Sequence, residues 1–504
     1  MELNTDFFNL INLKDVDLSG KIATIKYANF DDFNMDFYVD WSIDPYGVLN
    51  WRHNFLSLRW IDFKLNKKNI KLILASFYYF HYLKQNENNM IFSRLGDHTT
   101  AIRVSVLRRI RRLFLADNEP GFIFLCEFLI KKDLDALISD KVYRNGHNHG
   151  VIADTEILNT IDDLGIKDYL DASLIVDRGF SSLKSLFTSD GITMEHSVSY
   201  QEYNYPVAIE FLKSARNFSA NKNFNYQVLE ESTVDLIRYF SRSNGEFFPL
   251  GDSFREGNKS IRKNFLSNFD LSPAINSLAP ESQSLYCKNG FFSYVRNFSN
   301  LKVQFVSVCS WNSYHHKQDD ELSFCFEIDG NLVFDDPGYS DMVSKNDLDM
   351  LRSAESHSTV TIVGKEFSKK NSSPKGSTFT SWKEHSNGFY LQGQHSRIEN
   401  ILVTRVYEIL ERRLSIIDTI ESPSDIFTKH GFILGQGIGI EIKDRQVFLN
   451  KNGASLGVLS AEEQGHWLIS QIISIDSNRK NINKSIRLQY VLEKKSKCVF
   501  NFDF

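Results

Sequence analysis

Three short segments of the sequence concentrate side chains that can bind ions or transfer protons. The first reads GHNHG over residues 146–150, so Asn148 lies between two histidines at the start of an apolar periodic stretch. An amide at a helix N-terminus can donate hydrogen bonds to an anion, which the exposed backbone N–H groups also favour. The alternative is a capping loop, in which Asn148 or His149 caps the helix.

The second segment reads DGITMEHSVSYQ over residues 190–201 and lies between two expected helices. It is unusually polar and aromatic for a connection. In the functional interpretation it presents the hydroxyl of Tyr200 to a cleft, where a phenol can take part in proton transfer. The alternative is a turn that begins at Gly191 and continues into the first turn of the next helix.

The third segment reads SYHHKQDDELSF over residues 313–324 and is a histidine-rich approach to an apolar strand. Asp336 and His357 follow in two further segments, NLVFDDPGY and SHSTV. Together with Gln318 they offer two oxygen ligands and one nitrogen ligand, a set that suits one Zn²⁺ or Ca²⁺ ion. The alternative for this segment is the solvated edge of a hairpin.

Two kinds of periodicity predict the elements that must position these segments. Apolar residues recur at helical spacing from about residue 50 to residue 265. The clearest helices are expected over residues 69–84, 120–138, 151–164, 167–187, 205–218 and 226–242. After about residue 285 the period becomes two. Strands are expected over residues 302–309, 321–328, 358–363, 388–394, 401–409, 413–420 and 497–504.

The strands alternate with hairpin signals at Asp329-Gly330, Asn387-Gly388 and Asn452-Gly453. This pattern predicts an antiparallel β-sandwich of ten or more strands. Because helices and strands are segregated along the chain, the predicted fold class is α+β. A chain of 504 residues also exceeds what one hydrophobic core normally holds. We therefore expect a helical domain over residues 1–265 and a β-sandwich domain over residues 266–504.

The composition excludes several classes of protein. Apolar residues make up 42% and charged residues 24% of the chain, as in globular rather than disordered or fibrous proteins. A net charge of −5 gives no bulk attraction to nucleic acid. The longest apolar run, residues 121–130, is too short for a membrane span and contains Glu127. No signal peptide is recognisable, so we expect a cytoplasmic protein, or a periplasmic or secreted one if a leader was removed.

In these segments the sequence resembles the heparinase II/III family of polysaccharide lyases. HKQDDELSF, GNLVFDDPGY and SHSTVTIVG, between residues 316 and 364, are similar to the C-terminal signature of that family. The NHG at 148–150, the DG…EHSVSY at 190–200 and PLGDS at 249–253 are similar to motifs of its helical half, in the same order. The resemblance implies an incomplete α/α toroid followed by an antiparallel β-sandwich, which agrees with the change of period.

The resemblance also implies roles for single residues. Asn148 corresponds to the residue that engages the uronate carboxylate of the substrate, Tyr200 to the catalytic tyrosine, and His316 to a second proton-transfer group. The metal-site positions correspond to Gln318, Asp336 and His357. A single structural divalent metal, calcium or zinc, is therefore expected, and no organic cofactor. The expected partner is an acidic polysaccharide, with neither nucleic acid nor membrane.

The predicted reaction is β-elimination, which removes the C5 proton of a uronic acid and expels the group on O4. Asn148, with His149, can donate hydrogen bonds as charge grows on the carboxylate. A base must take the proton and an acid must protonate O4. Ionising a tyrosine at pH 7 costs roughly 4 kcal/mol, and a nearby cation such as His316 or Arg352 can supply part of this. The residues leave open whether Tyr200 is the acid alone or both base and acid.

The predicted function is thus a lyase acting on a uronate-containing glycan, such as a heparan-like or capsular polysaccharide. Two alternatives are a uronyl C5-epimerase on the same scaffold and a non-catalytic protein that binds acidic glycans. If the chain is a lyase, Asn148, Tyr200 and His316 should converge within about 10 Å in a cleft between the domains. The five arginines of AIRVSVLRRIRRLF, residues 101–114, fit a solvated face of a packed helix better than a substrate groove.

Overall fold

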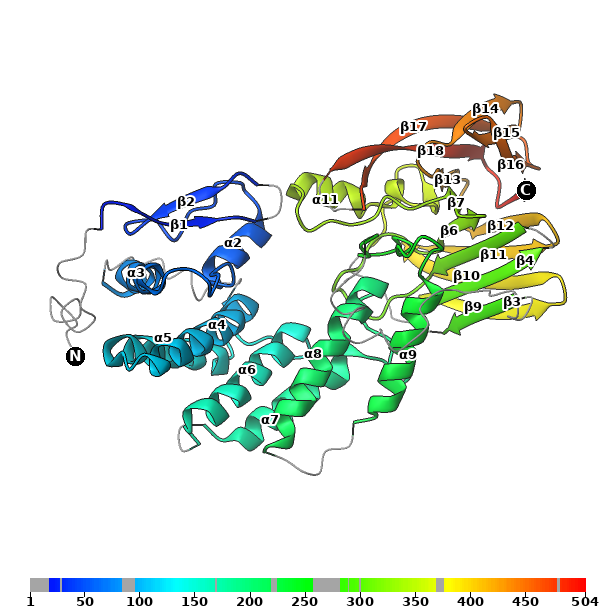
Figure 1. Ribbon diagram of the computed structural model, residues 1–504. Helices are drawn as coiled ribbons and strands as arrows, with labels where there is room; N and C mark the ends of the chain where they lie inside the picture. The colour runs from blue at the N-terminus through cyan, green and yellow to red at the C-terminus, as the bar shows by residue number, and fades with distance from the viewer. Residues whose placement is uncertain are drawn as a thin grey trace. The chain divides into compact units, whose positions relative to one another are not determined.

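The computed structural model confirms the predicted fold class (Figure 1). It describes residues 18–27, 30–83, 96–167, 170–218, 224–256, 282–288, 290–298, 301–368, 376–477 and 481–504. Helices dominate up to Tyr239 and antiparallel strands dominate from Ser282 onwards. The change of period in the sequence therefore marks a real change from helical to sheet structure.

Contacts between Cα atoms divide the chain into two compact units. Unit 1 comprises Met1–Leu186 and Val207–Phe224, and unit 2 comprises Phe187–Pro206 and Asn225–Phe504. The boundary predicted between residues 265 and 266 lies outside the described residues and stays a prediction. Two segments of the helical half thus belong to the same unit as the sheets, which matters for the site because one of them carries Tyr200.

Unit 1 is built mainly from helices that lie side by side, as Figure 1 shows for α4 to α7. Its elements are β1 (Lys21–Ile25), β2 (Phe33–Asp36), α2 (Leu49–Leu56), α3 (Lys67–Tyr78), the π-helical turn η1 (Tyr79–Leu83), α4 (Gly96–Ala116), α5 (Pro120–Ile138), α6 (Asn148–Leu164), α7 (Ala172–Leu186) and the second half of α8 (Val198–Arg216). The helix predicted from Pro120 is confirmed, because proline at a first helical turn loses no intrahelical hydrogen bond.

The five arginines in α4 are engaged by other side chains of unit 1. Arg103 is fully buried and donates to both carboxylate oxygens of Asp133, at 2.8 and 2.7 Å. Of the other four, Arg108 pairs with Asp163 and Glu156, and Arg109 lies over the ring of Phe63. Arg111 pairs with Glu127, and Arg112 pairs with Asp163. These arginines therefore stabilise helix packing, and the expected solvated face is wrong for Arg103, whose side chain is fully buried against Asp133.

His81, in η1, is a largely buried imidazole that packs against aromatic side chains. Its ring centroid lies 4.4 Å from that of Phe77 and 6.3 Å from that of Trp41. Its Nε2 has no hydrogen-bond partner among the described residues. Burial, aided by the charge of Arg103, lowers the pKa of His81 to about 3. In the unfolded chain a histidine titrates near 6.5, so this group costs stability as the pH falls from 6.5 towards 3.

We expect His81→Phe to stabilise the protein in acid but not at alkaline pH. At pH 5 the histidine is mostly protonated in the unfolded chain and neutral in the folded one. This difference lowers the unfolding free energy of the wild type by about 1–2 kcal/mol. A phenylalanine at the same position does not titrate and has no such loss. Urea denaturation at pH 5 and at pH 8 measures the difference. The same change at exposed His466 is the control and should show no such pH dependence. An equal effect of His81→Phe at both pH values would contradict the prediction.

Within the described residues, unit 2 contains three antiparallel sheets. The five-stranded sheet has the order β3 (Ser282–Cys287), β4 (Phe291–Phe298), β5 (Leu301–Val308), β6 (Ser323–Ile328) and β7 (Asn331–Phe334). The eight-stranded sheet has the order β14 (Gly439–Lys443), β15 (Gln446–Lys451), β16 (Ala454–Ala461), β19 (Lys497–Asp503), β12 (Arg413–Glu421), β11 (Ile401–Leu410), β10 (Gly388–Ile398) and β9 (Ser377–His385). The four-stranded sheet has the order β17 (His466–Ile475), β18 (Ile482–Glu493), β13 (Phe427–Ile433) and β8 (Val360–Ile362).

All three predicted hairpins form, and two use the predicted turn residues. Asp329 and Gly330 have φ of 46° and 78°, and Asn452 and Gly453 have φ of 51° and 81°. Consecutive positive φ angles are those of the turn type that suits a two-residue hairpin loop. The third hairpin turns one residue earlier than predicted, because His385 pairs with Gly388 and leaves Ser386 and Asn387 as the loop.

Two of the three hydrophobic clusters found among the described residues of unit 2 connect its larger elements. The larger lies among the three sheets and contains side chains such as Phe324, Tyr407 and Phe432. The second joins α9 (Tyr226–Tyr239) and the segment after it to the five-stranded sheet, with Leu236 and Phe240 in one cluster with Phe291. The second cluster explains why the chain after residue 225 groups with the strands. It also holds the PLGDS segment beside the sheet.

No helix among the residues described is long and apolar enough to cross a bilayer.

Candidate functional site

Tyr200 lies in the first turn of α8, which begins seven residues before the predicted helix. The hydroxyl of Ser197 accepts a hydrogen bond from the backbone N–H of Tyr200 at 3.1 Å and so caps the helix. A second hydrogen bond holds the start of α8. The backbone N–H of Phe254, directly after the PLGDS segment, donates to the hydroxyl of Ser199 at 2.8 Å. The segment around Tyr200 is therefore a turn followed by a helix start, and this start is fixed against the PLGDS segment.

His316 lies in the loop between β5 and β6, in an uncommon backbone conformation. Its φ is 56°, a value that costs a residue with a Cβ atom free energy unless its surroundings enforce it. The neighbouring Lys317 is buried and pairs with Asp320 and with Glu321, the latter at 3.2 Å. Buried Arg397 binds Glu321 in turn. This ion-pair network fixes the loop and hence the position of His316.

The structure brings His316 and Tyr200 into direct contact. Their rings stack with centroids 3.7 Å apart and an interplanar angle of 28°. His316 donates from Nδ1 to Oδ2 of Asp252 at 2.9 Å. This hydrogen bond fixes the tautomer and leaves Nε2 as the ring nitrogen that can accept a proton.

Asp252, in the PLGDS motif, joins three segments of unit 2. It is completely buried and accepts hydrogen bonds from His316, from Nε2 of Gln318 at 2.7 Å, and from Arg352, whose Nε lies 3.3 Å from Oδ1. Burial raises the pKa of Asp252, but the hydrogen bond from His316 and the charge of Arg352 outweigh it and hold the pKa below its ordinary value. Asp252 therefore acts as a buried carboxylate that orients a histidine and an arginine.

Sequence reasoning noted the Gly-Asp pair of PLGDS as a family motif but gave Asp252 no role. Asp252 lies 64 positions from its histidine partner, and no periodicity connects the two. The only signal was the motif itself, in which Gly251 has a φ of 63°. A Cβ at Gly251 would lie 2.4 Å from the carbonyl oxygen of His196, so only glycine allows this approach.

Tyr200 also interacts electrostatically with Tyr339. The guanidinium of Arg352 lies 5.2 Å from the ring centroid of Tyr339. Burial, together with Tyr339 and Asp252, raises the pKa of Tyr200 well above its ordinary value. The phenol of Tyr200 is therefore protonated at neutral pH.

The structure joins two of the three predicted metal ligands and gives the third another partner. Nδ1 of His357 donates to Oδ2 of Asp336 at 2.8 Å, and both side chains are fully buried. Gln318 instead donates to Asp252. Among the residues described, Nε2 of His357 and Oε1 of Gln318 are buried without a hydrogen-bond partner. No group of three His, Cys, Asp or Glu residues in the described part of the chain is arranged to hold a metal.

Asn148 and His149 lie in unit 1, at the start of α6. The N-cap is neither of them but His147, whose Nδ1 accepts from the N–H of His149 at 3.2 Å. Asn148 is buried, and Nδ1 of His149 lies 3.1 Å from Oδ1 of Asp97. Because Tyr200, His316 and Arg352 belong to unit 2, the convergence of Asn148 with them stays a prediction.

A pocket of about 410 Å³ lies beside the His316 cluster. Its lining residues all belong to unit 2 and are Trp311, Tyr314, His316, Lys317, Asp319, Asp349, Arg352 and Ser353. The exposed ring of Tyr314 stands edge-on to Trp311, with centroids 5.4 Å apart. An exposed aromatic ring, cations and carboxylates around one space are groups that can bind a sugar ring.

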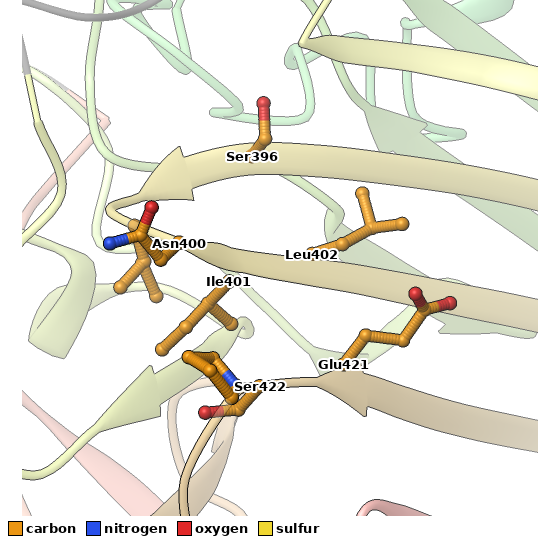
Figure 2. A pocket seen from close by; sticks show the side chains of 8 residues that line it. Ser396, Asn400, Ile401, Leu402, Glu421 and Ser422 are labelled. Atoms are coloured by element: carbon orange, nitrogen blue, oxygen red, sulfur yellow. The ribbon is translucent and has the colours of Figure 1, made fainter.

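Figure 2 shows a second pocket, of about 470 Å³, around the turn between β10 and β11. Its lining includes Asn400 from this turn, Ile401 and Leu402 from the start of β11, and Glu421 and Ser422 at the end of β12. Glu421 is the single ionisable side chain in that lining. Proton-transfer groups are therefore concentrated at the first pocket.

Comparisons with known proteins agree with this architecture. Residues 290–499 match the family model described as heparinase II/III-like, C-terminal. A crystal structure of heparinase III has a TM-score of 0.72 at 13% identity, over 92% of this chain and 78% of that one. Heparan sulfate lyase HepC from Pedobacter heparinus has a TM-score of 0.60 at 16% identity, over 100% of this chain and 83% of that one. No curated protein matched the sequence.

Residues 290–499 therefore match a heparinase II/III-like C-terminal domain, which confirms the resemblance of the motifs between residues 316 and 364. TM-scores of 0.72 and 0.60 over at least 92% of this chain show that these solved structures share its fold, a helical region followed by antiparallel sheets. Their identities, 13% and 16%, establish the fold and leave the chemistry to be argued from the site.

Proposed function

We propose that the protein is a polysaccharide lyase that cleaves a uronic-acid-containing glycan by β-elimination. The observation that carries this proposal is the stack of His316 on Tyr200, with Nδ1 of His316 held by buried Asp252. The pair joins a proton acceptor to a proton donor beside a sugar-sized pocket. The names of the similar solved structures, heparinase III and heparan sulfate lyase, support a glycosaminoglycan of the heparan type as substrate.

In this proposal His316 takes the C5 proton and Tyr200 protonates the leaving O4. The bond from His316 Nδ1 to Asp252 supports the first role, because it leaves Nε2 available and stabilises the imidazolium that forms. The raised pKa of Tyr200 keeps its phenol protonated, which supports the role of acid over that of base. Asn148, with His149, would neutralise the substrate carboxylate once the two units hold the same sugar.

An ultraviolet assay with uronate polysaccharides tests the proposal. A lyase produces an unsaturated uronate that absorbs ultraviolet light, so absorbance should rise with intact enzyme and a good substrate. A C5-epimerase would give no absorbance but would exchange the C5 hydrogen in D₂O, and a binding protein would do neither. Either of these results, over a panel of heparan-like and capsular polysaccharides, would replace the proposed reaction.

The chemistry of the buried donor atoms on His357 and Gln318 supports the proposal of one divalent cation with a structural role. Because Asp336 occupies Nδ1 of His357, Nε2 carries the lone pair that a metal needs. The carbonyl oxygen of Gln318 is buried and unpaired among the described residues, so it supplies a second donor of suitable chemistry. Calcium or zinc held by these residues would brace the loop that presents His316.

Chelation is therefore expected to lower thermal stability as well as activity. At a free-ion concentration about 100 times the dissociation constant, binding stabilises the fold by about 2.7 kcal/mol. Melting temperatures measured with and without EDTA, and after adding back Ca²⁺ or Zn²⁺, show this loss and its reversal. His357→Ala should remove the response to EDTA. A melting temperature that EDTA leaves unchanged in the wild type would argue against the metal.

A further inference from the structure

His196 is a buried histidine that connects the two segments of unit 2 that carry Tyr200 and His316. It lies four residues before Tyr200, and its ring reaches the turn of the chain just before His316. Its Nδ1 lies 2.9 Å from the hydroxyl oxygen of Ser310. Its Nε2 lies 2.9 Å from the carbonyl oxygen of Ser313 and 3.2 Å from the backbone nitrogen of the same residue. One side chain therefore joins the segment of Tyr200 to that of His316.

The ring of His196 is neutral and makes two hydrogen bonds in either tautomer. Burial, together with the charge of Lys317, lowers its pKa to about 4. One neutral tautomer donates from Nε2 to the carbonyl oxygen of Ser313 and accepts at Nδ1 from the hydroxyl of Ser310. The other donates from Nδ1 to that hydroxyl and accepts at Nε2 from the N–H of Ser313. Both forms hold the same turn at the same two points.

The backbone of His196 is held in the left-handed region by its neighbours. Its φ is 59°, a value that a residue with a Cβ atom keeps only where the surrounding structure enforces it. Its carbonyl oxygen lies so near Gly251 of the PLGDS segment that a Cβ there would be 2.4 Å away. The hydroxyl of Ser313 also donates to the carbonyl oxygen of Met194 at 2.8 Å. His196 is therefore fixed where three segments of unit 2 meet.

We propose that His196 is a positioning residue that sets the distance between the phenol of Tyr200 and the imidazole of His316. This inference rests on the proposed function, in which these two groups exchange protons with one sugar ring. Their stack, with centroids 3.7 Å apart, is a single contact between two separate segments. The hydrogen bonds of His196 tie the same segments together at a second place, which fixes the direction as well as the distance of that contact. His196 does not line the pocket, so it acts through the two residues that it positions.

His196→Asn tests the inference. Asparagine accepts a left-handed φ, so the backbone can stay, but its side chain is too short to contact Ser310 and Ser313 at once. We expect kcat to fall by roughly ten- to a hundredfold, because a displacement of about 1 Å between reacting groups has an effect of that size. KM should stay close to the wild-type value, since no contact with the substrate is removed. Both constants come from the ultraviolet assay on the best substrate.

Ser310→Ala gives the same test without changing His196. It removes one hydrogen-bond partner of the ring and should lower kcat by a smaller factor, about threefold, the scale of one neutral hydrogen bond. This variant decides the question if His196→Asn does not fold.

A double-mutant cycle separates positioning from a general loss of structure. In the Tyr200→Phe background the positioned hydroxyl is already absent, so His196→Asn should reduce kcat by a much smaller factor than it does in the wild type. A general defect would reduce kcat by the same factor in both backgrounds.

His430→Asn is the matched control. His430 is another fully buried histidine of unit 2 with two polar partners, Oδ2 of Asp418 at 2.6 Å and the hydroxyl of Thr428 at 3.1 Å. Its replacement should lower the melting temperature and leave kcat per folded molecule unchanged.

The outcomes distinguish this inference from the proposed function. Wild-type kcat in folded His196→Asn or Ser310→Ala, or an equal factor for His196→Asn with and without the hydroxyl of Tyr200, overturns the inference alone. A loss of kcat in His430→Asn as large as that in His196→Asn does so too. If the wild-type protein gives no ultraviolet-absorbing product from any polysaccharide of the panel, the proposed function fails and this inference fails with it.

Discussion

Tyr200→Phe is expected to lower kcat by roughly 10²-fold or more, because the change deletes the hydroxyl that would protonate the leaving O4. The ring stays, so its stack on His316 at 3.7 Å and the start of α8 should be preserved. Steady-state kinetics on the best substrate from the ultraviolet screen measure the loss. A melting temperature close to that of the wild type would show that the fold is intact.

Tyr205→Phe is the matched control for this change. Tyr205 lies on the same helix and is buried, and its hydroxyl bonds to that of Tyr226 at 2.8 Å. Losing that hydroxyl should reduce stability slightly and leave kcat unchanged. Turnover by Tyr200→Phe close to that of the wild type would remove Tyr200 from the proton transfer and leave the stack a packing contact.

Asp252→Asn is expected to reduce kcat by roughly a hundredfold or more, although Asp252 does not line the pocket. An amide can donate to Nδ1 of His316 as well as accept from it, so the tautomer with a free Nε2 lone pair is no longer enforced. The substitution also removes the counter-charge of Arg352, so both polar groups beside the pocket lose their anchor. Activity per folded molecule is the measurement, taken at several pH values.

Asp418→Asn is the matched control for Asp252→Asn. This buried carboxylate binds Nδ1 of His430 at 2.6 Å and both Arg405 nitrogens, Nε at 2.5 Å and Nη2 at 2.8 Å. All three side chains are fully buried between strands. Breaking either buried cluster should cost about 3–5 kcal/mol of stability. If Asp418→Asn reduces activity as much as Asp252→Asn does, the effect of Asp252 is structural and the argument for its role fails.

The comparison of these two clusters shows why the sequence revealed part of the site and not the rest. The hairpins at residues 329–330 and 452–453 were predictable because their φ angles depend on two local residues. The start of α5 at Pro120 is equally local. Asp252 is not, since its role depends on a histidine, a glutamine and an arginine that arrive from later parts of the chain. Nothing in the local pattern separates Asp252 from Asp418.

The division of the chain into units was hidden for a similar reason. Periodicity describes each helix by itself and does not report which surface a helix covers. Leu236 and Phe240 have ordinary helical spacing, yet they pack in one cluster with Phe291 of the five-stranded sheet. Gln318 illustrates the same limit at the scale of one side chain. Its position in the motif predicted a metal ligand, whereas its amide nitrogen is used to hold Asp252 and only its carbonyl oxygen remains for a cation.

Helix α8 belongs to both units, and this has a mechanical consequence. Its residues up to Pro206 group with the sheets, and those from Val207 group with the helical unit. Pro206 has no N–H to donate to the carbonyl of Glu202, so the helix lacks one internal hydrogen bond next to the crossing point. The missing bond leaves the first turns of α8, which carry Tyr200, less firmly tied to the part of the helix that groups with unit 1.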